Sequence, residues 1–124
     1  AAIRYISNGT YLTIIKDMLE KEVAEELQPL KARVVEMVKL YEQALEYVKE
    51  AQDQEMHDFL ARRLYNITAE IIMSLLILED ATRSAELFAK SANVYVRMAQ
   101  ADVIGDHAYI MNFVKEDLPS FRAE

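Results

Sequence analysis

The sequence predicts an all-α protein: an antiparallel, up-down four-helix bundle with one long central helix. Only two glycines and two prolines occur in 124 residues, which leaves little room for the turns of a β-sheet protein. Between residues 64 and 99, apolar and small residues recur at steps of three and four, as along the buried side of a helix. The stripe consists of Leu64, Ile67, Ile71, Leu75, Leu78, Thr82, Ala85, Ala89, Ala92, Val96 and Ala99. Because residues 71–78 are apolar on almost every side, we expect neighbours to cover this helix from several directions.

Composition indicates a single folded domain over residues 1–124. Charged residues make up 28% of the chain and apolar residues 52%, which is typical of a globular protein. The net charge of −7 argues against nucleic acid as a partner and against electrostatic docking on anionic lipid. The chain has no cysteine, so disulfides and thiolate metal sites are excluded, and we expect a cytoplasmic protein.

The start of the chain and its apolar runs indicate whether it carries a targeting or membrane-spanning segment. No signal peptide opens the chain, and the longest apolar run is far too short to span a membrane. The first residue is Ala1 rather than methionine. We interpret the chain as an excised piece of a longer polypeptide, with terminal processing as the alternative.

The first two helices follow from turn and cap signals. Asn8-Gly9 predicts a turn after a lead-in segment, and Thr10 can cap the first helix. That helix should extend over residues 11–27, because Gln28 precedes a proline and is biased away from helical torsions. Pro29 suits the first position of a second helix over residues 29–50.

Residues 51–54 form a short connection, which requires the helices on either side of it to be antiparallel. Asp53 is the expected N-cap of the third helix, which begins at Gln54. No glycine or proline interrupts it before Ala101, but about 48 residues would extend about 72 Å, twice the length of its neighbours. We therefore expect a turn near Lys90-Ser91, with Ser91 capping a fourth helix. A continuous helix, covered by a second subunit, is the alternative.

The end of the chain contains two further signals. Gly105-Asp106 predicts a weak point or a break in the fourth helix, and Leu118-Pro119 should close the helical part before a frayed tail to Glu124.

Acidic residues and histidines are the candidates for a functional site in this sequence. Asp53 and His57 are one helical turn apart, with Glu55 and Asp58 beside them, but capping of the helix is favoured there over metal binding. His107 is interpreted as an exposed histidine at the predicted break.

Three acidic residues interrupt the central helix: Glu70, Glu79 and Asp80. One of them could act as a general base in an apolar pocket. The favoured interpretation pairs Glu79 with Arg83 and places Glu70 and Asp80 on the outer face. No phosphate loop or dinucleotide motif is present in the sequence, so we assign no catalytic, cofactor-binding or metal-ligating residue.

Three segments carry a resemblance to a known family. They are residues 60–64 (LARRL), 73–86 (MSLLILEDATRSAE) and 94–99 (VYVRMA). Over residues 56–116, and more loosely over the first two helices, the sequence resembles the extra C-terminal helical domain of bacterial acyl-CoA dehydrogenases of the very-long-chain type.

The resemblance implies a parent flavoenzyme that oxidises the α,β bond of an acyl-CoA. FAD would accept the hydride, and an electron-transfer flavoprotein would receive the electrons. The catalytic glutamate and the flavin contacts would lie in preceding domains, so none is assigned here. The appended domain would pack on the enzyme body and contribute to dimerisation.

Two functions therefore remain open. In the first, the chain is an accessory domain of an FAD-dependent acyl-CoA dehydrogenase and has no activity alone. In the second, it is a stand-alone helical interaction or dimerisation module, whose long third helix forms a homodimer seam.

Overall fold

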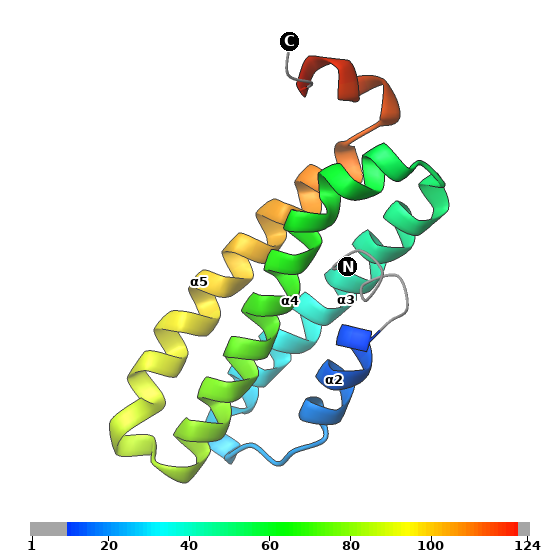
Figure 1. Cartoon of the computed structure of the whole chain (residues 1–124). Helices are drawn as coiled ribbons and strands as arrows, with labels where there is room; N and C mark the ends of the chain where they lie inside the picture. The colour runs from blue at the N-terminus through cyan, green and yellow to red at the C-terminus, as the bar shows by residue number, and fades with distance from the viewer. Residues whose placement is uncertain (1–9, 122–124) are drawn as a thin grey trace.

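A computed structural model describes residues 10–121 and shows an all-α bundle (Figure 1). Its elements in chain order are α2 (Thr10–Leu19), the 3-10 turn η1 (Glu25–Leu27), α3 (Gln28–Ala51), α4 (Gln54–Arg83), α5 (Ala85–Asn112) and the 3-10 turn η2 (Lys115–Phe121). No strand occurs among these residues, so the predicted fold class is confirmed. The Asn8-Gly9 turn and the tail after residue 121 lie outside the described residues.

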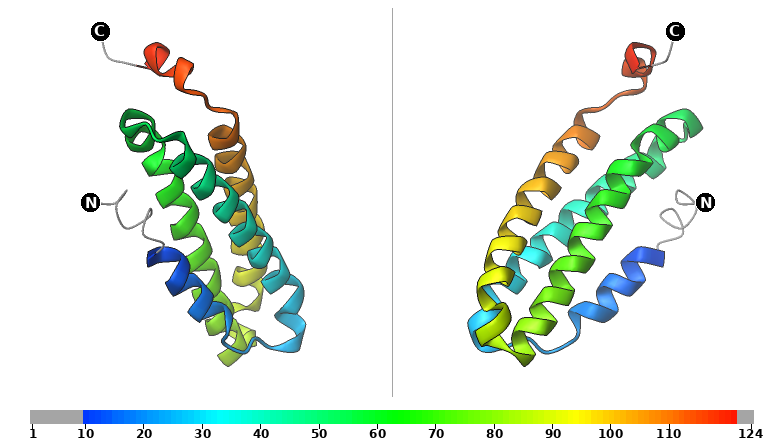
Figure 2. Two further views of the ribbon diagram at one scale, coloured as in Figure 1. Left: turned by 90° about the vertical axis from the view of Figure 1, so that its right-hand side faces the viewer. Right: turned by 60° about the vertical axis from the view of Figure 1, so that its left-hand side comes forward.

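The three long helices pack against one another in antiparallel order, and the short α2 completes the bundle (Figure 2). Helix α4 contacts α2, α3 and α5, which confirms the predicted long central helix. Helix α2 covers the groove between α3 and α4, since Tyr11 meets the ring of Tyr65 edge-on and Lys16 pairs with Glu42 at 3.8 Å. The groove between α4 and α5 has no such cover within the described part of the chain.

The predicted apolar stripe forms the centre of the core. Its large residues along α4 and its small residues along α5 face each other and α3. The buried members are Leu64, Ile67, Ile71, Leu75, Leu78, Ala92, Val96 and Ala99. Thr82 and Ala85 are exposed, because the chain reverses direction between them.

The reversal lies at Ser84, and the predicted turn near Lys90-Ser91 is wrong. The Ser84 N–H donates to the Asp80 carbonyl at 2.9 Å and ends α4. The Ser84 carbonyl accepts from the Phe88 N–H at 3.1 Å and opens α5. Only one non-helical residue separates the two helices, so the three-four spacing of apolar residues continues across the turn and gives no sign of it. Ser91, the predicted cap, is an exposed residue inside α5.

The first helix ends at Leu19, eight residues before the predicted end. The Lys21 N–H bonds the Met18 carbonyl three residues back, which closes α2 with a tight turn. The segment that follows is held by other elements: the Thr82 hydroxyl accepts from the Ala24 N–H at 3.2 Å, and the Gln28 side chain donates to the Val23 carbonyl at 2.8 Å. Tertiary partners thus replace helical hydrogen bonds that the local sequence would permit.

The second helix begins at Gln28, one residue before the predicted Pro29, because Gln28 adopts helical torsions despite the proline that follows it. Its successor begins at Gln54 as predicted. Helix α3 carries Pro29 in its first turn. It ends at Ala51, and Gln52 follows in the left-handed conformation with φ of 48°. Asp53 caps α4, its carboxylate accepting from the Met56 N–H at 3.0 Å.

The break predicted at Gly105-Asp106 is wrong, because α5 continues to Asn112. A glycine inside a helix costs about 1 kcal/mol, and the complete burial of Val103 and Ile110 on the core side of α5 offsets this. The helical part continues through Leu118-Pro119 as the 3-10 turn η2, in which Leu118 is buried.

Candidate functional site

A polar cleft lies between α4 and α5, on the side that α2 and α3 leave open. Its volume is about 530 Å³. The lining residues are Arg63, Asn66, Ala69 and Glu70 from α4, and Ala101, Asp102, Gly105, Asp106 and Tyr109 from α5. Small side chains at Ala69, Ala101 and Gly105 leave room between the two helices, while three carboxylates against one guanidinium make the cleft acidic.

Glu70 is the half-buried carboxyl group of this cleft. Its Oε1 accepts a hydrogen bond from the Tyr95 hydroxyl at 3.1 Å. Burial raises the pKa of Glu70, and the neighbouring carboxylates of Asp102 and Asp106 add to the rise, although the Tyr95 hydrogen bond opposes it. Burial together with Glu70 raises the pKa of Tyr95 to about 12. The predicted outer-face position of Glu70 is therefore wrong, since α5 partly covers it.

Arg63 neutralises one of the three carboxylates. Its guanidinium binds Asp106 at 2.9 Å and stacks over the ring of Tyr109, 3.6 Å from the ring centre. Among the ion pairs within residues 10–121, none gives Glu70 or Asp102 a cationic partner. The cleft therefore keeps negative charge that no side chain of the described region balances.

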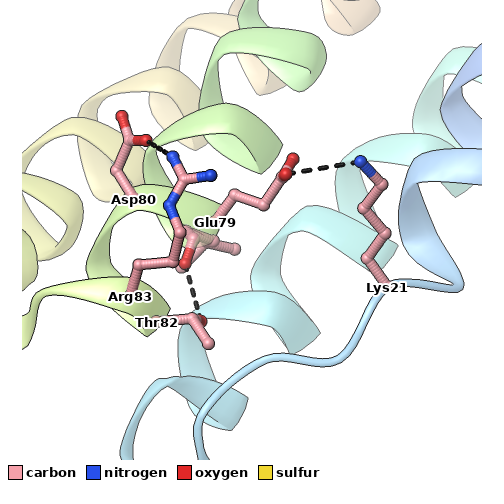
Figure 3. Close-up of polar contacts among 6 residues, drawn as sticks. Lys21, Glu79, Asp80, Thr82 and Arg83 are labelled. Carbon is pink, nitrogen blue, oxygen red and sulfur yellow. Dashed lines mark hydrogen bonds and ion pairs between the residues drawn. The ribbon is translucent and has the colours of Figure 1, made fainter.

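Glu79 and Asp80, the other two acidic candidates, lie in surface ion pairs (Figure 3). Glu79 pairs with Lys21 at 3.3 Å, and Arg83 pairs with Asp80 at 2.6 Å. The predicted Glu79–Arg83 pair is therefore wrong. Lys21 is 58 residues from Glu79 in sequence, so helix spacing could not indicate this partner.

The acidic residues around Asp53 and His57 make hydrogen bonds within the first turn of α4. Besides capping the helix, Asp53 lies 3.6 Å from the Lys115 ammonium. The hydrogen bond from the Met56 N–H is the main cause that lowers the pKa of Asp53. Asp58 accepts a hydrogen bond from Gln54 at 2.8 Å. Across residues 10–121, no group of three or more His, Cys, Asp or Glu side chains could hold a metal ion.

His107 is not at a turn, contrary to the sequence interpretation. It lies within α5, and its Nε2 is 3.0 Å from Oε1 of Gln43 on α3. Burial lowers its pKa, because the charged imidazolium is the form that loses solvation. His107 therefore contributes to helix packing.

An apolar groove extends the cleft towards the turn between α4 and α5. Its volume is about 430 Å³, and its lining residues are Ile77, Lys90, Ser91, Val94, Tyr95 and Met98. Tyr95 borders the groove and also binds Glu70 in the cleft. We call the cleft, the groove and the exposed side chains between them the α4–α5 face. The buried stripe of each helix gives no indication of this face, because the residues of the face lie outside that stripe.

Comparisons with known proteins agree on one family. Residues 7–118 match the family model described as acyl-CoA dehydrogenase C terminal. The structure is similar to the crystal structure of an acyl-CoA dehydrogenase family protein from Porphyromonas gingivalis, with a TM-score of 0.86 and 37% identity. That match covers 92% of this chain and 98% of the other. A comparison with curated proteins gave no match. No helix within the described residues is long and apolar enough to cross a membrane.

Proposed function

The chain belongs to the family of acyl-CoA dehydrogenase C-terminal domains, and from this premise we propose that it joins the subunits of a parent enzyme. It is an accessory helical domain of such an enzyme. The observation that carries the proposed role is the α4–α5 face, where the chain exposes large apolar side chains that no described element covers. Exposed apolar surface of this kind is typical of protein contacts. The expected packing on the enzyme body and the expected dimerisation both need such a surface.

The parent enzyme, in this proposal, dehydrogenates the α,β bond of an acyl-CoA in the cytoplasm. FAD supplies the acceptor for the hydride, and an electron-transfer flavoprotein takes up the electrons. The described residues of this chain do not fit FAD, because the acidic cleft would repel the flavin's pyrophosphate. FAD and the reacting acyl-CoA are therefore assigned to other parts of the parent enzyme.

The test compares the parent enzyme with a version that lacks residues 7–118. We expect the shortened enzyme to retain bound FAD, seen in its visible spectrum, while light scattering shows a lower subunit number. Retained FAD serves as the control for folding. Unchanged assembly of the shortened enzyme would contradict the proposed role, as would acyl-CoA-dependent dye reduction by the 124-residue chain alone.

A further inference from the structure

Glu70 has one carboxyl oxygen to which no described residue donates a hydrogen bond. Its Oε1 accepts from the Tyr95 hydroxyl at 3.1 Å, whereas its Oε2 is buried and has no such partner within residues 10–121. A buried acceptor without a donor is costly, and the cost is larger when the group is charged. An ionised Glu70 would therefore keep an unsatisfied oxygen inside the protein. A protonated Oε2 is instead a donor, and it needs an acceptor.

Asp102 on α5 supplies this acceptor. It lines the polar cleft from α5 as Glu70 does from α4, and the two carboxyl groups are within hydrogen-bonding reach of each other. Tyr95 and Asp102 are seven residues apart, which is about two helical turns, so both side chains lie on the side of α5 that faces Glu70. Two ionised carboxylates at this separation repel each other, whereas a carboxylic acid and a carboxylate form a strong hydrogen bond.

No cation of the described region takes the place of this proton. Arg63 is the one basic residue among those that line the cleft. Its guanidinium is held by Asp106 at 2.9 Å and by the ring of Tyr109, 3.6 Å from the ring centre. Neither Glu70 nor Asp102 takes part in an ion pair within residues 10–121. A proton is therefore the positive charge that remains for these two carboxylates.

The proton belongs to Glu70 rather than to Asp102, because Glu70 is half-buried and Asp102 is exposed. Burial disfavours the charged form of a carboxyl, whereas water stabilises the charge of the exposed one. Burial raises the pKa of Glu70, and the hydrogen bond and the charge of Asp102 raise it further. Two more titratable groups face Glu70 from α5: the hydrogen bond from Tyr95 lowers the pKa, and the charge of Asp106 raises it.

We propose that Glu70 and Asp102 share one proton, carried on Oε2 of Glu70 and donated to the Asp102 carboxylate, and that this hydrogen bond joins α4 to α5 across the cleft. When the proton passes to solvent, the hydrogen bond is lost and two like charges face each other. The pair then pushes the two helices apart at the cleft, so the α4–α5 face responds to pH. The shared proton lies within one chain, so the inference is independent of the proposed role in joining subunits.

The first test follows the side-chain carboxyl carbons by NMR as the pH rises. The Glu70 carbon should shift with a midpoint above the ordinary value of 4.5, and the Asp102 carbon should shift again at the same midpoint, because it loses the donated proton there. In Asp102→Asn the Glu70 midpoint should move to lower pH, since a like charge is removed and the new amide donates to Oε2.

Glu79→Gln is the matched control, because it neutralises a carboxylate of α4 that pairs with Lys21 on the surface. It should leave the curves of Glu70 and Asp102 unchanged. An Asp102 carbon that does not respond at the Glu70 midpoint would overturn the shared proton. A Glu70 midpoint that is the same in Asp102→Asn as in the wild type would overturn it as well.

The second test asks whether the pair joins the two helices. A double-mutant cycle of Glu70→Ala and Asp102→Ala, measured by urea unfolding, gives the coupling free energy between the two side chains. The coupling should stabilise the fold on the acid side of the Glu70 midpoint and destabilise it on the alkaline side, because a hydrogen bond is replaced by repulsion. The surface pair of Lys21 and Glu79 is the control cycle, and its coupling should not reverse in this way. A Glu70–Asp102 coupling of one sign on both sides of the midpoint would overturn the pH-dependent joint.

Discussion

The raised pKa of Glu70 arises from its packing against α5 and not from residues of its own helix. The pKa of its carboxyl is raised from the ordinary value of 4.5 by burial and by the carboxylates of Asp102 and Asp106. The folded chain therefore holds this proton more tightly than the unfolded chain does. The stability that this provides is complete below the ordinary carboxyl pKa, and it is lost as the pH rises through the raised value.

Replacing Glu70→Gln should remove this dependence on pH. The amide oxygen still accepts from the Tyr95 hydroxyl, but no proton is lost on raising the pH. We expect the melting temperature of the wild type to fall relative to the variant as the pH rises from below the ordinary carboxyl pKa through the raised pKa of Glu70. Tyr95→Phe, which removes the hydrogen bond to the ionised form, should make the fall steeper. Parallel melting curves for wild type and Glu70→Gln across this range would contradict the assignment.

The sequence identifies the acidic residues that interrupt the apolar part of α4, but it does not show which partner each of them has. Glu70 and Glu79 both interrupt the same apolar stretch, and local spacing gives each an acceptable surface position. Their difference arises from contacts distant in sequence: Tyr95 lies 25 residues from Glu70, and Lys21 lies 58 residues from Glu79. Only the packing of the helices decides which carboxyl meets the Tyr95 hydroxyl and which meets the Lys21 ammonium.

At the scale of elements, the segment between α2 and α3 depends on Thr82. The hydroxyl donates to the Leu78 carbonyl at 2.8 Å and accepts from the Ala24 N–H at 3.2 Å (Figure 3 shows its position beside Glu79 and Arg83). Thr82→Val keeps the shape and removes the acceptor, so the free energy of unfolding in urea should fall by about 1 kcal/mol. Thr82→Ser keeps the hydroxyl and should lose less than half of this. Equal losses would show that the Ala24 hydrogen bond contributes nothing.

Gly105 is the weak position within α5. A Cβ added there would have no neighbour within 4 Å, and the backbone is helical. Gly105→Ala should therefore raise the free energy of unfolding by about 0.5–1 kcal/mol, measured in urea at low protein concentration so that self-association does not contribute.

Ala101→Gly provides the matched control for Gly105→Ala, since it lies one turn earlier on the same exposed side. It should lower the free energy of unfolding by a similar amount. A lower free energy of unfolding for Gly105→Ala than for the wild type would contradict this account, because the added Cβ would then meet a neighbour that the structure does not place there.

The sequence predicted helix boundaries correctly only where they depend on a proline ring or on a capping side chain within one helical turn. Pro29 and Asp53 mark their helix starts to within one residue, because ring geometry and capping act within one turn. Ser84 has no glycine or proline beside it, and its reversal depends on α5 folding back onto α4. At Gly105 the sequence predicted a break where the helix continues, because burial of the neighbouring core residues outweighs the low helix propensity of glycine.

At the scale of the whole molecule, residues 10–121 form a bundle with a buried apolar core, and no element among them covers the α4–α5 face. The buried stripe predicted the fold class and the central helix correctly, because burial of apolar surface dominates folding. The α4–α5 face could not be predicted from that stripe, since the stripe follows only the buried side of each helix. A second three-four pattern, on the exposed side of α5, is the sequence signal for this face. It consists of Leu87, Ser91, Val94, Met98, Ala101 and Gly105.

The most direct measurement captures the native polypeptide from source cells with an antibody against this chain, and records its mass and its visible spectrum. An accessory domain of an acyl-CoA dehydrogenase predicts a polypeptide several-fold larger than 14.3 kDa, with the absorption bands of bound flavin. A colourless polypeptide of about the mass of this chain would contradict that function and leave a stand-alone helical interaction module.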